Sequence, residues 1–395
     1  MRREIVVVRN IEMLKKQNMF GVCYFFYNFA LKFDLICHNM STNDTSLSAS
    51  KTPIAELGEF GLIKRLTQDI KLQQPSSIKG VGDDAAVLDF TKHGQETQTL
   101  VTSDLLLEGI HFNLEYVPLK HLGYKAAVVN FSDIYAMNGT PTQIIVSLGI
   151  SKRFSVEDVQ ALYDGIRLAC EHYHVDIVGG DTTSSMTGLT ISITCMGVAG
   201  KDEVVYRNGA KVNDLICVTG NLGAAYLGLQ LLERERIVMQ ANAKATPAFE
   251  GKEYLLERQL KPQARVDIIQ QLKQAGIKPT AMMDISDGLS SELMHICKQS
   301  GVGCAIYEDK LPIDYQSAVL AEEMNMSIVT CALNGGEDYE LLFTCSLDDY
   351  EKLIPIDDLY LVGHITKPEY GTMLIGRNDE ELSLQAQGWQ AFKEN

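Results

Sequence analysis

The sequence predicts an α/β (α+β) protein of two domains. The chain has 395 residues, 46% of them hydrophobic and 22% charged, which is enough to bury one large or two medium cores. From Ile54 onward, short apolar segments alternate with longer segments whose apolar residues recur at helical spacing. The alternation stops near residues 200–210 and then restarts, which indicates a second domain. We expect an N-terminal domain at 53–203 and a C-terminal domain at 204–395.

Residues 1–52 show no pattern that ties them to either domain. We expect an N-terminal extension that is disordered or that precedes the true start of translation, for which Met40 is one candidate. An apolar run at 19–31 is shorter than the roughly 20 residues that span a bilayer. Basic residues followed by an apolar run also fit a signal peptide, but Asn28 interrupts the run and Lys32 follows it. We therefore expect a cytoplasmic protein.

The first series of elements opens with an amphipathic helix over 54–70. Apolar segments rich in β-branched residues predict strands over 100–109, 144–150, 175–180 and 189–200. Longer segments with helical spacing predict helices over 121–139 and 155–173. The second series predicts strands over 215–220 and 281–286 and helices over 223–235, 265–276 and 290–301.

The charge of the chain restricts its partners. A formal net charge of −16 and a pI near 5.0, without a basic patch, argue against nucleic acid and against an anionic membrane surface. An acidic protein that binds nucleotides needs divalent cations to neutralise both its carboxylates and the phosphates. The nine cysteines are scattered, with no Cys-x-x-Cys pair, so we expect buried free thiols in a reducing compartment.

Aspartates recur beside glycine, serine or threonine at the ends of apolar segments. A single aspartate in such a place usually forms a turn or caps a helix. Several gathered together would repel one another unless hard cations lay between them, and Asp is a standard oxygen ligand of Mg²⁺. The five groups are GVGDDA (Asp83, Asp84), VTSD (Asp104), NFSD (Asp133), VGGD (Asp181) and DISDG (Asp284, Asp287).

Neighbouring hydroxyls and glycines suit the same chemistry. Oxygen atoms for metal ions are available from Thr102, Ser103 and Ser286. Close approach of backbone N–H groups to phosphate is possible at Gly80, Gly82, Gly179 and Gly180. The sequence contains no G-x-x-x-x-G-K-[ST] and therefore no P-loop. Residues 80–85 match the weak dinucleotide fingerprint G-x-G-x-x-A, but no buried strand precedes them and two aspartates would face the pyrophosphate unscreened.

Three further residues have both a structural and a functional interpretation. Glu337, in NGGEDYELLF, lies either on a solvated acidic loop or on a loop shaped to face a ligand. His111 is either a structural histidine or a ligand contact. Arg207, near the predicted domain junction, either forms a surface ion pair or meets phosphate in a cleft.

The motifs in their order along the chain resemble the thiamine-monophosphate kinase family. They are GEFGLI, GVGDDAAVL, TSD…GIHF, KAAVVNFSDIYAMNG, DIVGGDTT, YRNGAK…D, DISDGL and NGGEDYELLF, from about Glu56 to Thr366. This family belongs to a superfamily with aminoimidazole ribonucleotide synthetase and selenophosphate synthetase. The resemblance implies the two-domain aminoimidazole ribonucleotide synthetase-like fold, with an N-terminal domain that forms a homodimer interface and a C-terminal α/β domain that closes over the nucleotide.

The resemblance also implies roles for individual residues. Those that match magnesium ligands are Asp84, Thr102, Ser103, Asp104, Asp133, Asp181, Asp284 and, for a further ion, Asp287. Those that match ATP contacts are Gly180, Asp181, Arg207 and Ser286. Those that match contacts to thiamine monophosphate are His111, Glu337 and Trp389. The tail reads GWQAF where the family has GWDHF, and residues 1–50 have no counterpart in the family.

The implied reaction is Mg²⁺-dependent transfer of the γ-phosphoryl group of ATP to thiamine monophosphate, giving thiamine diphosphate. The alternatives are another ATP-dependent enzyme of the superfamily with a different small substrate, or a non-catalytic nucleotide-binding protein. Selenophosphate synthetase would need a reactive Cys near the N-terminal glycine-rich segment, and the hydrogenase-maturation relative would need a C-terminal Cys. This chain ends in AFKEN, and all the aspartates of the motifs are present.

Overall fold

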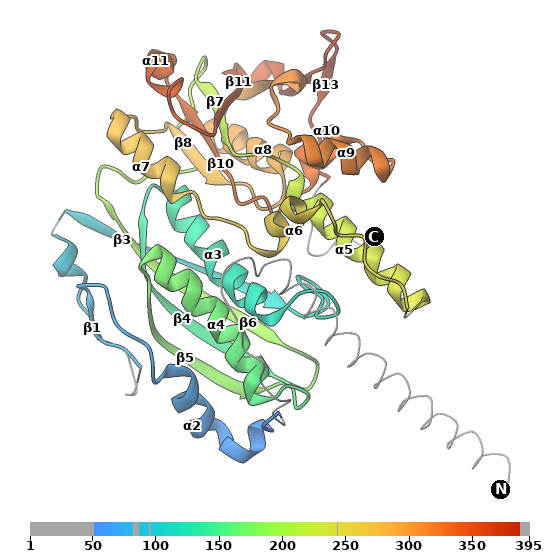
Figure 1. The fold of residues 1–395 in the computed structure, drawn as a ribbon. Helices are drawn as coiled ribbons and strands as arrows, with labels where there is room; N and C mark the ends of the chain where they lie inside the picture. The colour runs from blue at the N-terminus through green and yellow to red at the C-terminus, as the bar shows by residue number, and fades with distance from the viewer. Residues whose placement is uncertain (1–50, 82–86, 95, 243, 388–395) are drawn as a thin grey trace, which may run out of the picture.

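The computed structural model describes residues 51–81, 87–94, 96–242 and 244–387. Each half of the chain contributes one large β-sheet, and helices pack against both sheets (Figure 1). A small antiparallel pair, β1 (Ser77–Lys79) and β2 (Val87–Leu88), lies before the first large sheet. Helix α2 (Ile54–Thr67) precedes this pair and packs beside the first half. Short 3-10 helices occur at Phe90–His93, Glu308–Lys310, Leu347–Asp349 and Pro368–Tyr370.

The first sheet has four strands in the order β3-β6-β4-β5. Their bounds are β3 Thr97–Leu107, β4 Thr140–Ile150, β5 Asp176–Ser184 and β6 Thr190–Gly200. Strand β6 is antiparallel to both β3 and β4, whereas β5 is parallel to β4. Strands β3 and β5 therefore form the two edges of this sheet.

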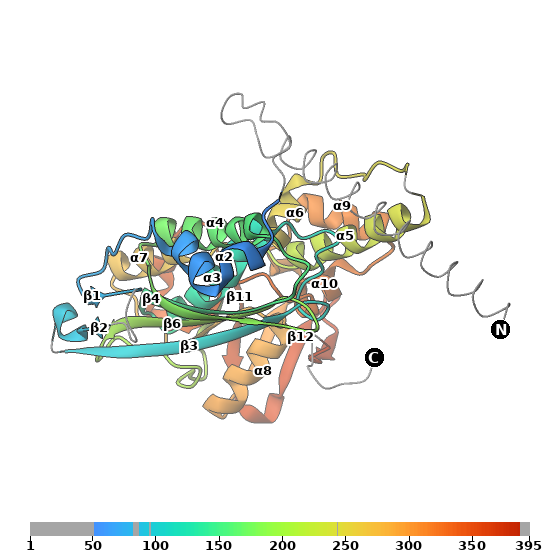
Figure 2. The ribbon, with the colours of Figure 1, turned by 90° about the horizontal axis from the view of Figure 1, so that it is seen from below.

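Helices α3 (Leu119–Ala136) and α4 (Val156–Tyr173) cover one face of the first sheet (Figure 2). A capping box between Ser155 and Asp158 begins α4. Alternate residues of the central strands, such as Ile144 and Ile193, point into this layer and are fully buried.

The opposite face of the first sheet is open. The side chains of Val101 and Leu105 on β3 are 66% and 53% exposed. Because side chains alternate across a strand, Leu100 and Leu106 of the same strand are buried against the helices. The open face therefore carries apolar residues that no described part of the chain covers.

The second sheet has seven strands in the order β13-β12-β9-β11-β7-β10-β8. All neighbours are antiparallel except β9 and β12. The strands are β7 Leu215–Thr219, β8 Ala281–Asp284, β9 Gly303–Tyr307, β10 Leu341–Cys345, β11 Leu359–Thr366, β12 Thr372–Ile375 and β13 Glu381–Ser383. The helices of this half are α5 Ala224–Ala241, α6 Glu253–Leu260, α7 Val266–Ala275, α8 Leu289–Ser300, α9 Tyr315–Glu323, α10 Ile328–Asn334 and α11 Tyr350–Leu353.

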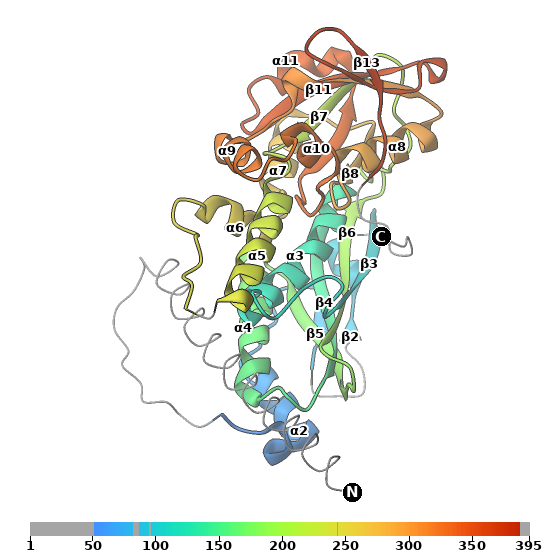
Figure 3. The same cartoon turned by 90° about the vertical axis from the view of Figure 1, so that its right-hand side faces the viewer.

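The two halves share a continuous apolar core. Phe131 of α3 and Phe343 of β10 are both fully buried and belong to one cluster of packed side chains. The other face of the second sheet has a separate core, which includes Ile216 of β7 and Leu293 of α8. Helix α3 is thus enclosed between the first sheet and the edge of the second sheet that carries β8 (Figure 3).

The predicted strands and helices are all present, with ends that differ by a few residues. The structure also contains strands β1, β2, β9, β11, β12 and β13 and helices α6, α9, α10 and α11, which were not predicted. Most of these segments have too few residues to show a clear period, although β11 is eight residues long. The seven cysteines that lie in the described ranges are buried and free, as expected. Within the same ranges, no helix is both long and apolar enough to cross a membrane.

Candidate functional site

Three aspartates from separate elements lie close enough to affect one another's ionisation. They are Asp104 on β3, Asp133 on α3 and Asp284 at the end of β8. Burial raises the pKa of Asp104 to about 6, and the charge of Asp133 adds to this shift. Burial and the charges of Asp133 and Asp104 raise the pKa of Asp284 to about 7. We call these three residues the aspartate cluster; its mutual repulsion creates a negative potential that a cation would neutralise.

Helix α3 connects the members of the aspartate cluster through side-chain hydrogen bonds. The hydroxyl of Thr102 donates to Oδ2 of Asp133 at 2.6 Å. The hydroxyl of Ser132 donates to Oδ2 of Asp284 at 2.6 Å. The backbone N–H of Asp104 donates to Oδ1 of Asn130 at 3.1 Å.

Ser132 and Asn130 were missed by the sequence reasoning, which selected only Asp133 from the NFSD motif. A signal for both was available in the sequence. They are polar residues in an otherwise apolar stretch of the predicted helix, and both are fully buried in the structure. Buried polar side chains of this kind need hydrogen-bond partners, and here the partners belong to the aspartate cluster.

The expectation that these aspartates lie at strand ends is correct only for Asp284. Asp104 and Asp181 lie within β3 and β5, and Asp133 lies within α3. Strand β5 extends past its apolar portion because its threonines and Ser184 continue to pair with the longer strand β4, whereas in β3 the apolar residues resume after Asp104. Polar residues after an apolar run therefore did not mark the end of the strand.

Two predicted metal ligands lie on the opposite, open face of the first sheet. The hydroxyl of Ser103 is 3.1 Å from that of Thr194, its cross-strand partner, because alternation along β3 turns Ser103 away from Thr102 and Asp104. Asp181 is exposed, and its Oδ1 accepts the N–H of Thr182 at 2.8 Å.

Asp181 is also distant from the aspartate cluster along the sheet. It lies on the edge strand β5, and strands β4 and β6 separate β5 from β3. Three interstrand spacings correspond to roughly 14 Å. Within one chain, therefore, the structure does not bring the side chains of Ser103 and Asp181 to the aspartate cluster.

The glycine pair before Asp181 has two different environments. A Cβ atom on Gly180 would lie 2.1 Å from the carbonyl oxygen of Val146, so the neighbouring strand β4 excludes any side chain there. A Cβ on Gly179 would meet no atom within 4 Å. The packing of the sheet alone accounts for Gly180, while Gly179 leaves open space beside the backbone.

Arg207 is close enough to Asp133 and to Asp287 to affect the ionisation of both carboxyl groups. Its segment is fastened to β8 by a hydrogen bond of 3.0 Å from the N–H of Met282 to the carbonyl of Tyr206. Burial raises the pKa of Asp287, and the charges of His295 and Arg207 counteract that shift. Burial likewise raises the pKa of Asp133, and the hydrogen bond from Thr102 and the charge of Arg207 counteract that shift. The exposed guanidinium is therefore available to an anionic ligand near both carboxylates.

The DISDG and NGGEDYE segments pack against each other. The carbonyl of Ser286 accepts the N–H of Glu337 at 2.7 Å. Gly336 has φ of +72°, and a Cβ there would lie 2.6 Å from the same carbonyl, so only glycine fits. The N–H of Asp287 donates to Oε1 of the buried Glu292 at 2.9 Å. These contacts hold Ser286, Asp287 and Glu337 in one layer above the end of β8.

Two of the three residues expected to contact thiamine monophosphate lie in the described ranges, and their surroundings differ. His111 is exposed just beyond β3, and its Nδ1 accepts the N–H of Leu107 at 3.0 Å. Glu337 is partly buried and pairs with Lys125 of α3 at 3.0 Å. Asp83, Asp84, Gly82 and Trp389 lie outside the described residues.

The donor set fits magnesium ions that are shared with phosphate. Among the residues in the described ranges, no three His, Cys, Asp or Glu side chains converge closely enough to form a metal site by themselves. Mg²⁺ commonly takes only one or two protein carboxylates and completes its shell with water and substrate phosphates. The aspartate cluster and the Thr102 hydroxyl supply oxygen donors of that kind.

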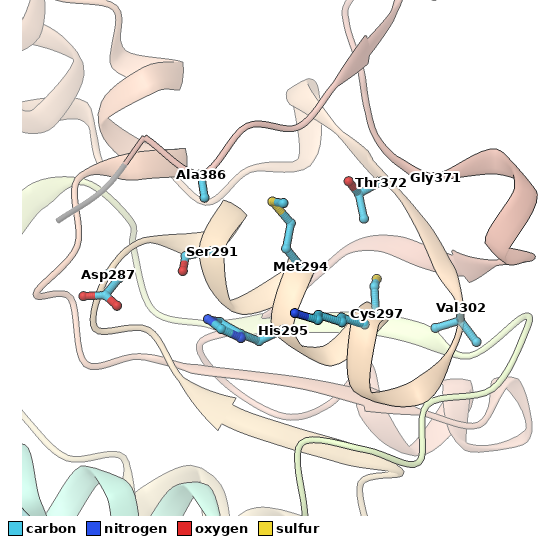
Figure 4. Close-up of a pocket in the computed structure, with 10 residues that line it drawn as sticks. Asp287, Ser291, Met294, His295, Cys297, Val302, Gly371, Thr372 and Ala386 are labelled. Atoms are coloured by element: carbon cyan, nitrogen blue, oxygen red, sulfur yellow. The ribbon is translucent and has the colours of Figure 1, made fainter. Parts of the chain in front are cut away.

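A cavity of about 540 Å³ lies beside Asp287. Asp287 and Ser291 line one end of it, and Met294 and His295 project into it from α8 (Figure 4). Thr372 lies across the cavity from α8. The cavity therefore has a carboxylate at one end and a larger apolar portion, and it does not include the aspartate cluster.

Two family models match the chain in succession. The model for the N-terminal domain of the AIR synthase related proteins matches residues 82–199, and the model for the C-terminal domain matches residues 211–354. Together they cover the first large sheet and strands β7, β8, β9 and β10 of the second, whereas β11, β12 and β13 lie beyond residue 354.

Known relatives cover nearly the whole chain. Thiamine-monophosphate kinase of Bacillus subtilis (strain 168) is 32% identical over 345 residues, which are 85% of this chain and 100% of that protein. The enzyme of Aquifex aeolicus (strain VF5) is 32% identical over 339 residues, 86% of this chain and 99% of that protein. The solved structure of AaThiL complexed with AMPPCP and TMP has a TM-score of 0.66 and 31% identity, covering 88% of this chain and 100% of that one. The chain belongs to the thiamine-monophosphate kinase family.

Proposed function

We propose that this chain transfers the γ-phosphoryl group of ATP to thiamine monophosphate, giving thiamine diphosphate and ADP. The observation that carries the proposal is the aspartate cluster, in which burial raises the pKa of all three carboxyl groups and the charge of Asp133 adds to the shifts of Asp104 and Asp284. Membership of the family over 85% of the chain supplies the substrate pair. Similarity to a structure complexed with AMPPCP and TMP supports the same two ligands.

In this proposal, the aspartates hold the cations that neutralise the negative charge of the two substrates. Bound Mg²⁺ would supply charge neutralisation between two anionic substrates. Asp104, Asp133 and Asp284 would hold the ions from the helix-covered side of the sheet, with Thr102 keeping Asp133 oriented. Arg207 would contact the phosphates of ATP, and Asp287 and Ser286 would border the same space. The acceptor phosphate is already largely ionised near pH 7, so no general base is assigned.

The proposal includes a homodimer that forms through the open face of the first sheet. Exposed Val101 and Leu105 would be covered by a second copy, because apolar side chains gathered on one face favour association. Ser103 and Asp181 share that face and would then lie at the interface. Their separation from the aspartate cluster within one chain agrees with a role that involves two copies. A reducing cytoplasm agrees with the seven buried free thiols.

The decisive experiment is a product assay. Purified protein should convert thiamine monophosphate to thiamine diphosphate with ATP and Mg²⁺, detected by chromatography of the fluorescent thiochrome derivatives. The reaction should stop with EDTA and with Asp133→Asn, whereas Asp164→Asn, an exposed position on α4, should react like wild type. ATP consumption without thiamine diphosphate would assign the chain to a different acceptor. Absence of both would contradict a phosphotransferase.

A further inference from the structure

The loop that carries Glu337 is held in an uncommon backbone conformation. Glu337 and Tyr339 have φ of +58° and +51°, a region that residues other than glycine adopt only when their surroundings enforce it. The residues between and after them face the interior. Asp338 and Glu340 are each 1% exposed. Buried residues in this loop therefore alternate with residues that face the candidate site. We call the two buried residues, Asp338 and Glu340, the anchors of the loop.

Both anchors have several charge-assisted partners. The carboxylate of Asp338 accepts the N–H of Gly223 at 2.9 Å, at the start of α5. The carboxylate of Glu340 pairs with Arg258 at 2.8 Å and with Arg265 at 2.7 Å. Such hydrogen bonds are about twice as strong as neutral ones, so they stabilise the strained backbone around Glu337.

The Glu337 carboxylate is itself held by one of its two oxygens. Oε2 accepts from Nζ of Lys125 at 3.0 Å and from Nε2 of Gln259 at 2.7 Å. No residue in the described ranges donates a hydrogen bond to Oε1 of Glu337, which leaves that oxygen for a ligand.

Lys125 is a buried cation that connects three elements. Its side chain is 8% exposed and extends from α3, in the first half of the chain. Nζ also donates at 3.1 Å to the carbonyl of Gln259, in the last turn of α6. Helix α6 also carries Arg258, which donates to the carbonyl of Asp338 at 3.1 Å. Lys125 therefore links α3 both to α6 and to the loop that α6 supports.

We propose that Lys125 is a positioning residue for the acceptor substrate, acting through Glu337. Its ammonium group holds Oε2 so that Oε1 keeps a single orientation toward the bound acceptor. A free glutamate side chain would lose rotamer entropy on binding, and a side chain already fixed loses less. This inference rests on the proposed function, because it takes Glu337 as a contact to thiamine monophosphate.

A purely structural role makes a different prediction. If Lys125 served only to satisfy the carbonyl at the end of α6, its removal would weaken the fold and both substrates alike. If Lys125 positions Glu337, its removal should weaken binding of the acceptor substrate alone. That weakening should appear only when Glu337 is present. A double-mutant cycle separates these two roles.

The test compares Lys125→Met, Glu337→Ala and the double variant with wild type. Lys125→Met should raise KM for thiamine monophosphate about tenfold and change KM for ATP less than twofold. In the Glu337→Ala background, Lys125→Met should not raise the KM for thiamine monophosphate any further. Lys125→Arg, which keeps the charge, should recover part of the lost affinity. Lys120→Met, an exposed position on the same helix, is the matched control and should behave like wild type.

Three results would overturn the positioning role. The first is an unchanged KM for thiamine monophosphate in Lys125→Met. The second is an equal rise of that KM with and without Glu337, and the third is a parallel rise of KM for ATP. If Lys125→Met does not fold, Gln259→Leu removes the other donor to Oε2 and should raise the same KM. An unchanged KM in Gln259→Leu would also count against the role. If wild type forms no thiamine diphosphate, the proposed function fails independently of Lys125.

Discussion

The hydroxyl of Ser132 donates a hydrogen bond of 2.6 Å to Oδ2 of Asp284. Ser132 belongs to α3, which covers the first sheet, and Asp284 ends β8 of the second sheet. Both residues are buried, so the contact joins the two halves of the chain inside the aspartate cluster. The donated hydrogen bond stabilises the ionised carboxylate and partly offsets the effect of burial on the pKa of Asp284.

The protein without metal should lose stability as the pH rises from about 4 to about 7. In the folded protein the pKa values of Asp104 and Asp284 are about 6 and about 7, compared with an ordinary value of 3.8. The folded state therefore holds these protons more tightly than the unfolded chain. Their stabilising contribution is complete below pH 4 and is lost as the pH rises through the folded pKa values. Thermal unfolding in EDTA across this range measures the effect.

Asp284→Asn is the matched control for this dependence. It keeps the acceptor for Ser132 and removes the charge, so the free energy of unfolding at pH 7.5 should rise by about 1–3 kcal/mol. Mg²⁺ should stabilise wild type more than the variant. Identical pH profiles for the two proteins would show that Asp284 does not titrate in this way.

Asp181→Asn should abolish phosphoryl transfer and leave the fold intact. The side chain is exposed on β5, and its Oδ1 accepts the N–H of Thr182, a hydrogen bond that Asn can also accept. A metal that bridges phosphate oxygens would lose a charged ligand, whereas a turn or cap residue would tolerate Asn. Steady-state rates at several Mg²⁺ concentrations provide the measurement. A near-wild-type rate with unchanged Mg²⁺ dependence would remove Asp181 from the metal site.

Charged substitutions on the open face should separate the proposed dimer. Val101→Lys and Leu105→Lys place ammonium groups where two copies would bury apolar side chains. Sedimentation should show a shift toward monomer, and circular dichroism should be unchanged because both positions are exposed in the single chain. Ile237→Lys, at an exposed position of α5 far along the chain, serves as the control. Dimers that persist in both open-face variants would place the interface elsewhere.

Deletion of residues 1–39 should leave folding and activity intact. That segment shows no sequence pattern that ties it to either domain. Solubility and specific activity of the truncated protein test this expectation. A large loss of either would assign residues 1–39 a role in the fold.

Much of the fold followed from periodicity in the sequence. Segments such as 189–200 and 155–173 have a period of two or of 3.6 over ten or more residues, and both form the predicted element. Short segments such as β12 and α11 have too few residues to show a period, so they emerged only from the structure. Strand ends were the least predictable feature, because pairing with β4 extended β5 beyond its apolar residues.

The residue types of the candidate site were also readable from the sequence. Aspartates beside serine, threonine and glycine indicated oxygen ligands and phosphate, since that chemistry depends on side-chain type and local spacing. The sequence by itself thus determined an acidic, two-domain α/β protein with candidate magnesium ligands.

Only the tertiary structure decided which of these residues meet. Thr102 and Ser103 are adjacent in sequence, yet strand alternation sends one to Asp133 and the other to the open face. Ser132 meets Asp284, and Lys125 meets Glu337, across more than 150 residues of chain. These pairings depend on the packing of α3 between two sheets. Long-range packing of that kind has no local signal, because it is set by which buried surfaces fit together once the whole chain has folded.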